Sequence, residues 1–302
     1  MSAPSVLLTG ATGLIGRQVV APLLANGCRV IAASRSGEPV AGAEALALDM
    51  LDGAGVTRAL SGLGATHLIH LAWHDGPKDR WGSPANLDWV GASLHLLRAF
   101  AAAGGRRAVM VGSCAEYDWS GAASGAVAED TPMRPATLYG AAKAATGIAA
   151  LAGAGALGVS LVWARPFFCY GPGEPDGRLF GDIIRGLRAG RQVDCTDGLQ
   201  KRDFLTTFDL ARALCDLLVS PLEGAVNVAS GRAEAVREVI LMLAHEMGGE
   251  DRIHLGARPR PASDPPLILA DVTRLTNGTG FRPAHDLAAG VRATLLAEGV
   301  LP

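Results

Sequence analysis

The sequence predicts an α/β fold, a doubly wound parallel sheet with a smaller cap, and three observations support this. Short apolar runs alternate with helix-like segments over the first two-thirds of the chain. A glycine-rich turn separates the first apolar run from the first helix. Beyond Trp163 the chain becomes rich in glycine and proline, over 166–178 and 256–266. Because strands that alternate with helices form parallel sheets with right-handed crossovers, we expect the doubly wound arrangement.

The apolar runs predict six strands before the change in texture, at 6–8, 30–33, 45–48, 67–71, 108–111 and 159–163. They show little polar alternation, as expected of strands covered by helices on both faces. Helices are expected near 14–25, 53–60, 86–103 and 138–155. Helices near 177–189 and 233–247 should build the cap, whereas a helix over 204–219 and a strand over 225–229 should return to the main sheet. This predicts a main domain of 1–165 plus 204–230, interleaved with a cap of 166–203 plus 231–302.

Composition narrows the function classes. A net charge of −2 over 302 residues gives no reason to expect nucleic acid or an anionic membrane as partner. No apolar run reaches 18 residues and no charged segment precedes one, so we expect a soluble, cytoplasmic protein. Five scattered cysteines without a Cys-x-x-Cys pair indicate reduced thiols. His70 and His74, with Asp75 beside them, superficially resemble metal ligands, but they lack a third histidine nearby in sequence, so we expect no metal.

The glycine-rich turn predicts a dinucleotide-binding (Rossmann) site. Its residues expected at the cofactor are Gly10, Thr12, Gly13, Leu14, Ile15 and Gly16. The first glycine allows a tight turn, the second a close approach to pyrophosphate, and the third close packing of helix on sheet. Arg35, after the second predicted strand, can pair with a 2′-phosphate and so favours NADP over NAD, which stays possible. Asp49 and Met50, after the third strand, are expected beside the adenine.

Tyr139 and Lys143 are the main candidates for chemistry. The chain has 27 basic residues, of which only three are lysine, yet one lysine stands four residues after a tyrosine. Residues i and i+4 share a helix face, so the ammonium should lie near the phenol and lower its pKa from about 10. Ser113 follows the preceding strand and could hydrogen-bond a substrate carbonyl while Tyr139 transfers the proton.

These motifs resemble the extended short-chain dehydrogenase/reductase superfamily and, within it, the NAD-dependent epimerase/dehydratase family, whose typical substrates are nucleotide sugars. The matching segments are 9–16, 113–117, 139–143, 165–173, 202–204 and 227–231. The resemblance implies a catalytic triad of Ser113, Tyr139 and Lys143. It also implies that Leu71, Ala72 and Pro166 lie at the cofactor and that the helices near 86–103 and 138–155 pair in a homodimer.

The resemblance also bears on the substrate. It matches Arg202 to an arginine that binds the diphosphate of a nucleotide sugar, with Arg178 and Arg258 as candidate helpers. The family's 4,6-dehydratases carry an Asp-Glu pair where this chain has Cys114 and Ala115, which argues against dehydration by that route. Glu116, one residue further, should face elsewhere on an extended backbone. Cys114 remains a candidate substrate contact.

The leading hypothesis is therefore an NADP(H)-dependent reductase of a nucleotide-linked keto-deoxysugar. Three alternatives stay open: an epimerase with tightly bound NAD, a reductase of a non-nucleotide ketone, and a non-catalytic dinucleotide-sensing module. The same triad serves both reductase and epimerase chemistry, so the sequence does not separate these two.

Overall fold

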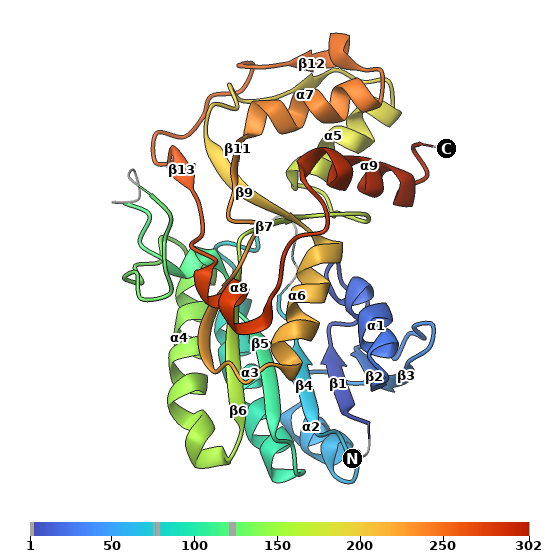
Figure 1. The fold of residues 1–302 in the computed structure, drawn as a ribbon, viewed down its shortest axis with the longest axis vertical. Helices are drawn as coiled ribbons and strands as arrows, with labels where there is room; N and C mark the ends of the chain where they lie inside the picture. Colours follow the sequence, from blue (N-terminus) through green and yellow to red (C-terminus); the bar gives the residue numbers. More distant parts are fainter. Residues whose placement is uncertain (1–2, 75, 77–78, 121–124, 302) are drawn as a thin grey trace.

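A computed structural model describes residues 3–74, 76, 79–120 and 125–301. Its main sheet has seven parallel strands in the order β10-β6-β5-β4-β1-β2-β3 (Figure 1). Their bounds are β1 Ser5–Thr9, β2 Arg29–Ser34, β3 Glu44–Ala47, β4 His67–His70, β5 Arg107–Val111, β6 Ser160–Pro166 and β10 Gly224–Val228. The strand order reverses between β1 and β4, and such a switch point opens a crevice at the carboxyl ends of the strands. The predicted α/β fold class is confirmed.

Helices cover both faces of this sheet. They are α1 Gly16–Ala25, α2 Gly53–Leu60, α3 Ala85–Ala102, α4 Leu138–Ala154 and α6 Thr207–Val219. Alternate residues of β1 point to opposite faces of the sheet. Val6 and Leu8 lie in the core under α1 and α6, and Leu7 lies in the core under α2, α3 and α4. Residues 138–157 are long and apolar enough to cross a membrane by composition, but here α4 packs against α3 and β6.

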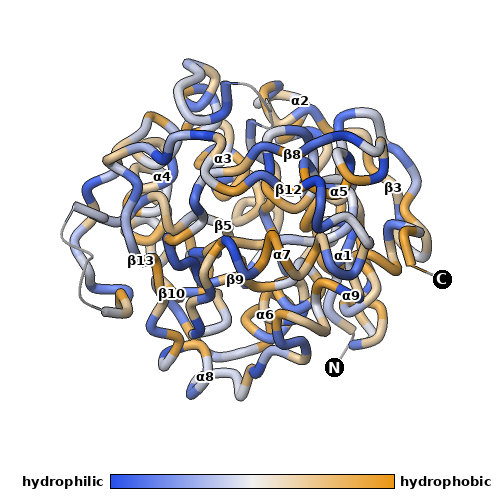
Figure 2. The backbone as a smooth tube through the Cα atoms, turned by 90° about the horizontal axis from the view of Figure 1, so that it is seen from above, coloured by the Kyte–Doolittle hydropathy of each residue, from blue (hydrophilic) through white to orange (hydrophobic). Residues whose placement is uncertain are grey.

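The cap has a separate core. Its strands are β7 Phe168–Tyr170, β8 Val193–Asp194, β9 Lys201–Thr206, β11 Ala233–Ala235, β12 Ile253–His254 and β13 Leu267–Ile268. Its helices are α5 Leu179–Arg188, α7 Val236–Glu246 and α9 Leu287–Ala297, while α8 Thr273–Thr279 packs beside β10. Seen from above, α7 lies over the middle of the molecule (Figure 2), and its apolar face packs against α5 and α9.

Two local predictions were wrong. Residues 168–170 form β7 inside the segment expected to be a loop, and 204–206 complete β9 where a helix was expected. Both strands pair with each other through Phe168 and Phe204, a contact between segments more than 30 residues apart. The helix begins only after Thr206, whose hydroxyl caps α6 by accepting a hydrogen bond from Asp209 N at 3.0 Å.

Candidate active site

Ser113, Tyr139 and Lys143 meet at one cavity of about 520 Å³ above the carboxyl ends of the main strands. Tyr139 and Lys143 lie on the first two turns of α4, whose start is capped by the Thr137 hydroxyl accepting from Gly140 N at 3.1 Å. Ser113 comes from the turn after β5. The three predicted catalytic residues are therefore neighbours, although the serine and the tyrosine come from different elements of the fold.

Lys143 is buried and held away from the phenol. Its Nζ donates a hydrogen bond to Val111 O at 2.8 Å and lies 3.7 Å from the centroid of the Trp73 ring. The centroid of the Tyr139 ring is 6.0 Å away. Burial lowers the pKa of Lys143 to about 7, and the Glu116 carboxylate opposes this. The ammonium is thus stabilised by a carbonyl and by the face of an indole.

The pKa of Tyr139 is raised to about 12, which contradicts the expected lowering. Burial is the largest cause, because the phenolate loses its hydration; a hydrogen bond between the Ser113 and Tyr139 side chains opposes the rise. Trp73 and Trp81 contribute to the burial by packing edge-on against the phenol ring, with centroids 6.4 and 5.3 Å away. At neutral pH Tyr139 is therefore a phenol, a proton donor poised beside Ser113.

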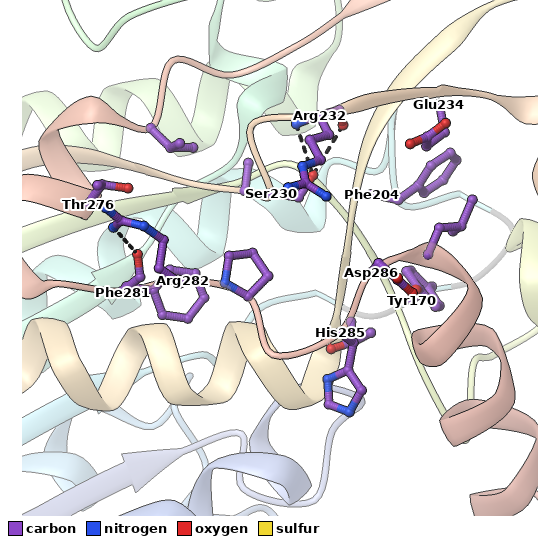
Figure 3. Close-up of a pocket in the computed structure, with 15 residues that line it drawn as sticks. Tyr170, Phe204, Ser230, Arg232, Glu234, Thr276, Phe281, Arg282, His285 and Asp286 are labelled. Atoms are coloured by element: carbon purple, nitrogen blue, oxygen red, sulfur yellow. Dashed lines mark hydrogen bonds between the residues drawn. The ribbon is translucent and has the colours of Figure 1, made fainter.

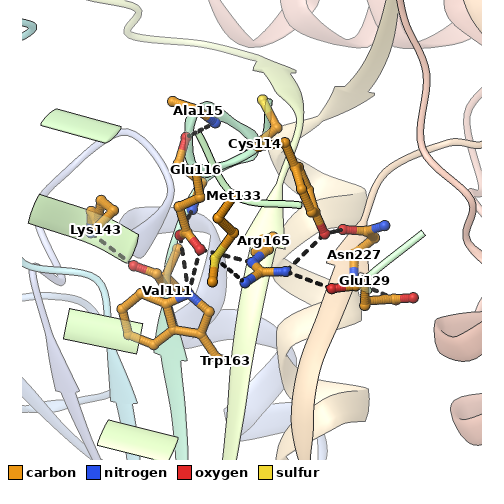
Figure 4. Close-up of polar contacts among 12 residues, drawn as sticks. Val111, Cys114, Ala115, Glu116, Glu129, Met133, Lys143, Trp163, Arg165 and Asn227 are labelled. Carbon is orange, nitrogen blue, oxygen red and sulfur yellow. Dashed lines mark hydrogen bonds and ion pairs between the residues drawn. The ribbon is translucent and has the colours of Figure 1, made fainter. Parts of the chain in front are cut away.

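A buried carboxylate, that of Glu116, holds the backbone at Ser113, and Figure 4 shows it beside Arg165 and Trp163. Glu116 accepts hydrogen bonds from Ser113 N at 2.8 Å, Arg165 Nε at 2.8 Å and Trp163 Nε1 at 3.0 Å. Residues 114–116 form a 3₁₀ turn, so the expected extended backbone was wrong, and the turn directs Glu116 into the protein. Burial raises the pKa of Glu116, and Arg165 counters that rise. Glu116 therefore fixes the serine backbone and does not line the cavity.

The two positions that hold an Asp-Glu pair in 4,6-dehydratases lie at the cavity wall. Cys114 and Ala115 both line it. Burial raises the pKa of the Cys114 thiol to about 12, so it stays protonated and cannot act as a base at neutral pH. Ala115 carries no titratable group. Neither side chain supplies the proton transfer that elimination of water needs.

The glycine turn between β1 and α1 has the shape of a dinucleotide cradle. Gly10 has φ +72°, and a Cβ there would lie 2.8 Å from Ala72 N, so only glycine suits this position. A Cβ at Gly16 would overlap Gly10 O, which shows how closely α1 approaches the turn. At Gly13 an added Cβ would meet only Gly10 O, at 3.3 Å, so the space above that backbone is open.

The other predicted cofactor residues lie in several different places. Ile15, Leu71 and Pro166 line the catalytic cavity, which therefore reaches the glycine turn. Arg35 is exposed at the end of β2, and Asp49 is exposed after β3, where its carboxylate accepts from Leu51 N at 3.0 Å. Met50 is buried in the core under α2 and α3. Thr12 and Leu14 lie within the turn itself.

The predicted substrate arginines divide between two adjoining cavities. Arg178 lines the catalytic cavity and donates to Cys169 O at 2.7 Å and Glu174 Oε1 at 3.3 Å. Arg202 and Arg258 line a neighbouring cavity of about 750 Å³ in the cap. The two cavities share the side chains Phe168, Leu179 and Phe204 as walls.

Arg202 is buried and already holds protein partners. It donates to Pro265 O at 2.8 Å and forms an ion pair with Asp264. Burial lowers the pKa of Arg202, and Asp264 opposes this. The guanidinium is thus held in place at the wall of the cap cavity before any ligand arrives.

The chain is similar to known proteins of one family. The profile of the NAD dependent epimerase/dehydratase family matches residues 6–229. The chain belongs to this family. It is 29% identical to a dTDP-4-dehydro-6-deoxy-D-allose reductase of Streptomyces bikiniensis, over 96% of this chain and 94% of the relative.

Solved structures of the family superpose closely on this one. MoeE5 in complex with UDP-glucuronic acid and NAD has a TM-score of 0.85 and 30% identity, over 97% of this chain and 98% of that one. The UDP-glucose 4-epimerase of Thermus thermophilus in complex with NAD has a TM-score of 0.84 and 27% identity, over 98% of this chain and 99% of that one. The protein is therefore an NAD(P)-dependent enzyme of the short-chain dehydrogenase/reductase type, and its open glycine turn fits that cofactor.

Sequence reasoning missed two residues that line the catalytic cavity. Arg80 and Glu174 line the catalytic cavity, and Glu174 is buried, with Gly181 N donating to it at 2.9 Å. No local motif marks either residue, since each reaches the cavity from a loop. Trp73, Trp81 and Trp119 also line this cavity. Trp89 instead packs on Trp73, with ring centroids 6.1 Å apart.

Two other features lie apart from the chemistry. A cavity of about 450 Å³ on the other side of β9, lined by Arg282 and Thr276 among others, contains none of the predicted site residues (Figure 3). His70 is buried between the hydroxyls of Thr9 at 2.7 Å and Ser93 at 2.9 Å, and burial lowers its pKa to about 3. It is thus a neutral core histidine; Asp75 lies outside the described residues, which hold no cluster of three metal-ligating side chains.

Proposed function

We propose that this protein is an NADP(H)-dependent reductase of a keto group on a nucleotide-linked sugar. The observation that carries the proposal is the meeting of Ser113, Tyr139 and Lys143 in a cavity that adjoins an arginine-lined one. The catalytic cavity would receive the sugar and the cap cavity its nucleoside diphosphate. Arg202 and Arg258, at the walls of the cap cavity, suit phosphate oxygens.

The residues have distinct roles in the reduction. Ser113 hydrogen-bonds the carbonyl oxygen and so orients the carbon that is to be reduced. NADPH, when bound at the glycine turn, would supply the hydride that this carbon needs. Tyr139 gives its phenolic proton to the same oxygen, so that the carbonyl becomes an alcohol. Lys143 provides positive charge in the neighbourhood of the phenolate that remains.

The protonated form of Tyr139 is compatible with reduction. A phenol with a pKa of about 12 is in its acid form throughout the physiological range, and the acid form is the one that a reduction consumes. The relative from Streptomyces bikiniensis is named as a reductase, which supports the same direction. Exposed Arg35 at the end of β2 supports NADP.

The test is NADPH oxidation with a panel of dTDP- and UDP-linked keto sugars, comparing the wild-type protein with Tyr139→Phe. The variant should lose activity by on the order of 100-fold or more while it binds NADPH as before. Undiminished turnover in Tyr139→Phe would contradict the mechanism. Purified protein that carries tightly bound NAD and consumes no added NADPH would favour the epimerase instead.

A further inference from the structure

Arg80 reaches the tyrosine end of the catalytic cavity from the segment between β4 and α3. Its guanidinium carbon lies 5.1 Å from the centroid of the Trp81 ring. Two hydrogen bonds hold the backbone here: Asn86 Nδ2 donates to Arg80 O at 2.9 Å, and Tyr139 N donates to Trp81 O at 3.1 Å. Arg80 is therefore fastened to the start of the catalytic helix α4, and its side chain lines the cavity.

The guanidinium of Arg80 lacks a counterion among the described residues. Its Nε is buried with no hydrogen-bond partner, and no carboxylate of the described residues forms an ion pair with it. A buried arginine N–H is normally paired, because leaving it unpaired forfeits its hydration without replacement. Burial and the nearby Arg178 both lower the pKa of Arg80, and Tyr139, Cys169 and Glu174 oppose this.

The charges around this end of the cavity do not balance. Arg178 is compensated by Glu174 at 3.3 Å. Arg80 and Lys143 line the same cavity, and Lys143, with a pKa of about 7, is only partly charged at neutral pH, so Arg80 is the further full cation. A sugar hydroxyl could fill one donor site of Arg80 but would leave its charge uncompensated. A carboxylate accepts two parallel N–H bonds from the guanidinium fork and neutralises it as well.

We propose that the sugar carries a carboxylate next to the reacting carbon, as a hexuronic acid does, and that Arg80 binds it. This inference rests on the proposed function and refines it, because it places a carboxylate where a 6-deoxysugar has a methyl group. The Tyr139 hydroxyl would then act on the ring carbon beside the one that bears the carboxylate. The Trp81 ring lies against the Arg80 guanidinium on one side, with its centroid 5.1 Å from the guanidinium carbon.

The experiment compares the binding of glucuronic acid and glucose, each as its UDP and dTDP conjugate, to protein saturated with NADP⁺. Wild-type protein should bind the glucuronate conjugate at least tenfold more tightly than the glucose conjugate of the same nucleotide. Arg80→Met should weaken glucuronate binding by roughly 30-fold or more and leave glucose binding unchanged. Arg106→Met, an exposed arginine before β5, makes the same charge change and should alter neither affinity.

A structural role for Arg80 would give a different result. Because its Nε has no partner, Arg80→Met should keep the wild-type melting temperature or raise it; a lower one, with the glucuronate preference intact, would overturn the proposal. Equal affinity for the two sugars in wild-type protein would also overturn it. That outcome would leave the proposed reductase function standing, whereas failure of all four conjugates to bind would count against both.

Discussion

Replacing Lys143 with methionine should change how the stability of the protein depends on pH. The pKa of Lys143 is about 7 in the folded protein and 10.5 as the ordinary value. Between these two values the unfolded chain holds one proton more than the folded one. Because stability rises with pH wherever the unfolded state binds more protons, this lysine makes the fold more stable as pH increases from 7 to 10.5.

The magnitude follows from the same two values. The difference between the two pKa values means that burial of the charged ammonium destabilises the folded protein by roughly 5 kcal/mol. This destabilisation applies in full below pH 7. Between pH 7 and pH 9 the free energy of unfolding should rise by about 2 kcal/mol from this group alone. The substitution also removes the contacts to Val111 O and to the Trp73 ring. Their loss changes the free energy of unfolding of the variant by the same amount at every pH, so it does not alter how the difference from wild type depends on pH.

Urea unfolding at pH 7, 8 and 9 measures this directly. The free energy of unfolding of the wild-type protein minus that of Lys143→Met should increase by about 2 kcal/mol from pH 7 to pH 9. The other titrating groups are the same in both proteins and cancel in this difference. Lys201→Met is the matched control, because Lys201 is exposed on β9, and its curve should run parallel to that of the wild-type protein. Parallel curves for wild type and Lys143→Met would refute the buried, proton-releasing lysine.

Three further outcomes are expected. Arg35→Asp should weaken NADPH binding by roughly tenfold and affect NADH much less, measured by coenzyme fluorescence; equal losses would reject the 2′-phosphate contact. Gly16→Ala should abolish NADPH binding because its Cβ overlaps the glycine turn, whereas Gly153→Ala, with open space around it in α4, should stabilise the fold by about 0.5–1 kcal/mol in thermal unfolding. If α3 and α4 form a homodimer interface, Ile148→Asp, on the exposed side of α4, should give monomers in sedimentation; Leu241→Asp on the cap should not, and an unchanged dimer in Ile148→Asp would place the interface elsewhere.

The sequence predicted those features whose cause is local. Gly10 needs a backbone conformation that favours glycine, and Gly16 lies too close to the Gly10 carbonyl for a side chain. Both requirements are local, so the turn can be recognised from the order of its residues along the chain. Tyr139 and Lys143 share a face because a helix imposes it. The doubly wound sheet followed from the alternation of apolar strands with helices, which is likewise a repeating local pattern.

Features that depend on contacts between distant segments were not predictable in the same way. Phe204 lies in a strand because it pairs with Phe168 of β7. Nothing in the sequence of either segment indicates that it pairs with the other. The pKa of Tyr139 rises because loops that carry Trp73 and Trp81 enclose it. An i, i+4 rule places Lys143 on the right face of α4 but cannot show that its ammonium turns to Val111 O.

The acid form of Tyr139 and the uncompensated charge of Arg80 are linked. In the free protein, Arg80 is one of the groups that lower the pKa of Tyr139, against the larger effect of burial. A carboxylate paired with Arg80 would cancel that influence and exclude water from the phenol. Both changes raise the pKa of Tyr139 further and so make the phenol a weaker acid. A carboxylate-bearing substrate would therefore gain affinity from Arg80, and it would gain no catalytic advantage through Tyr139.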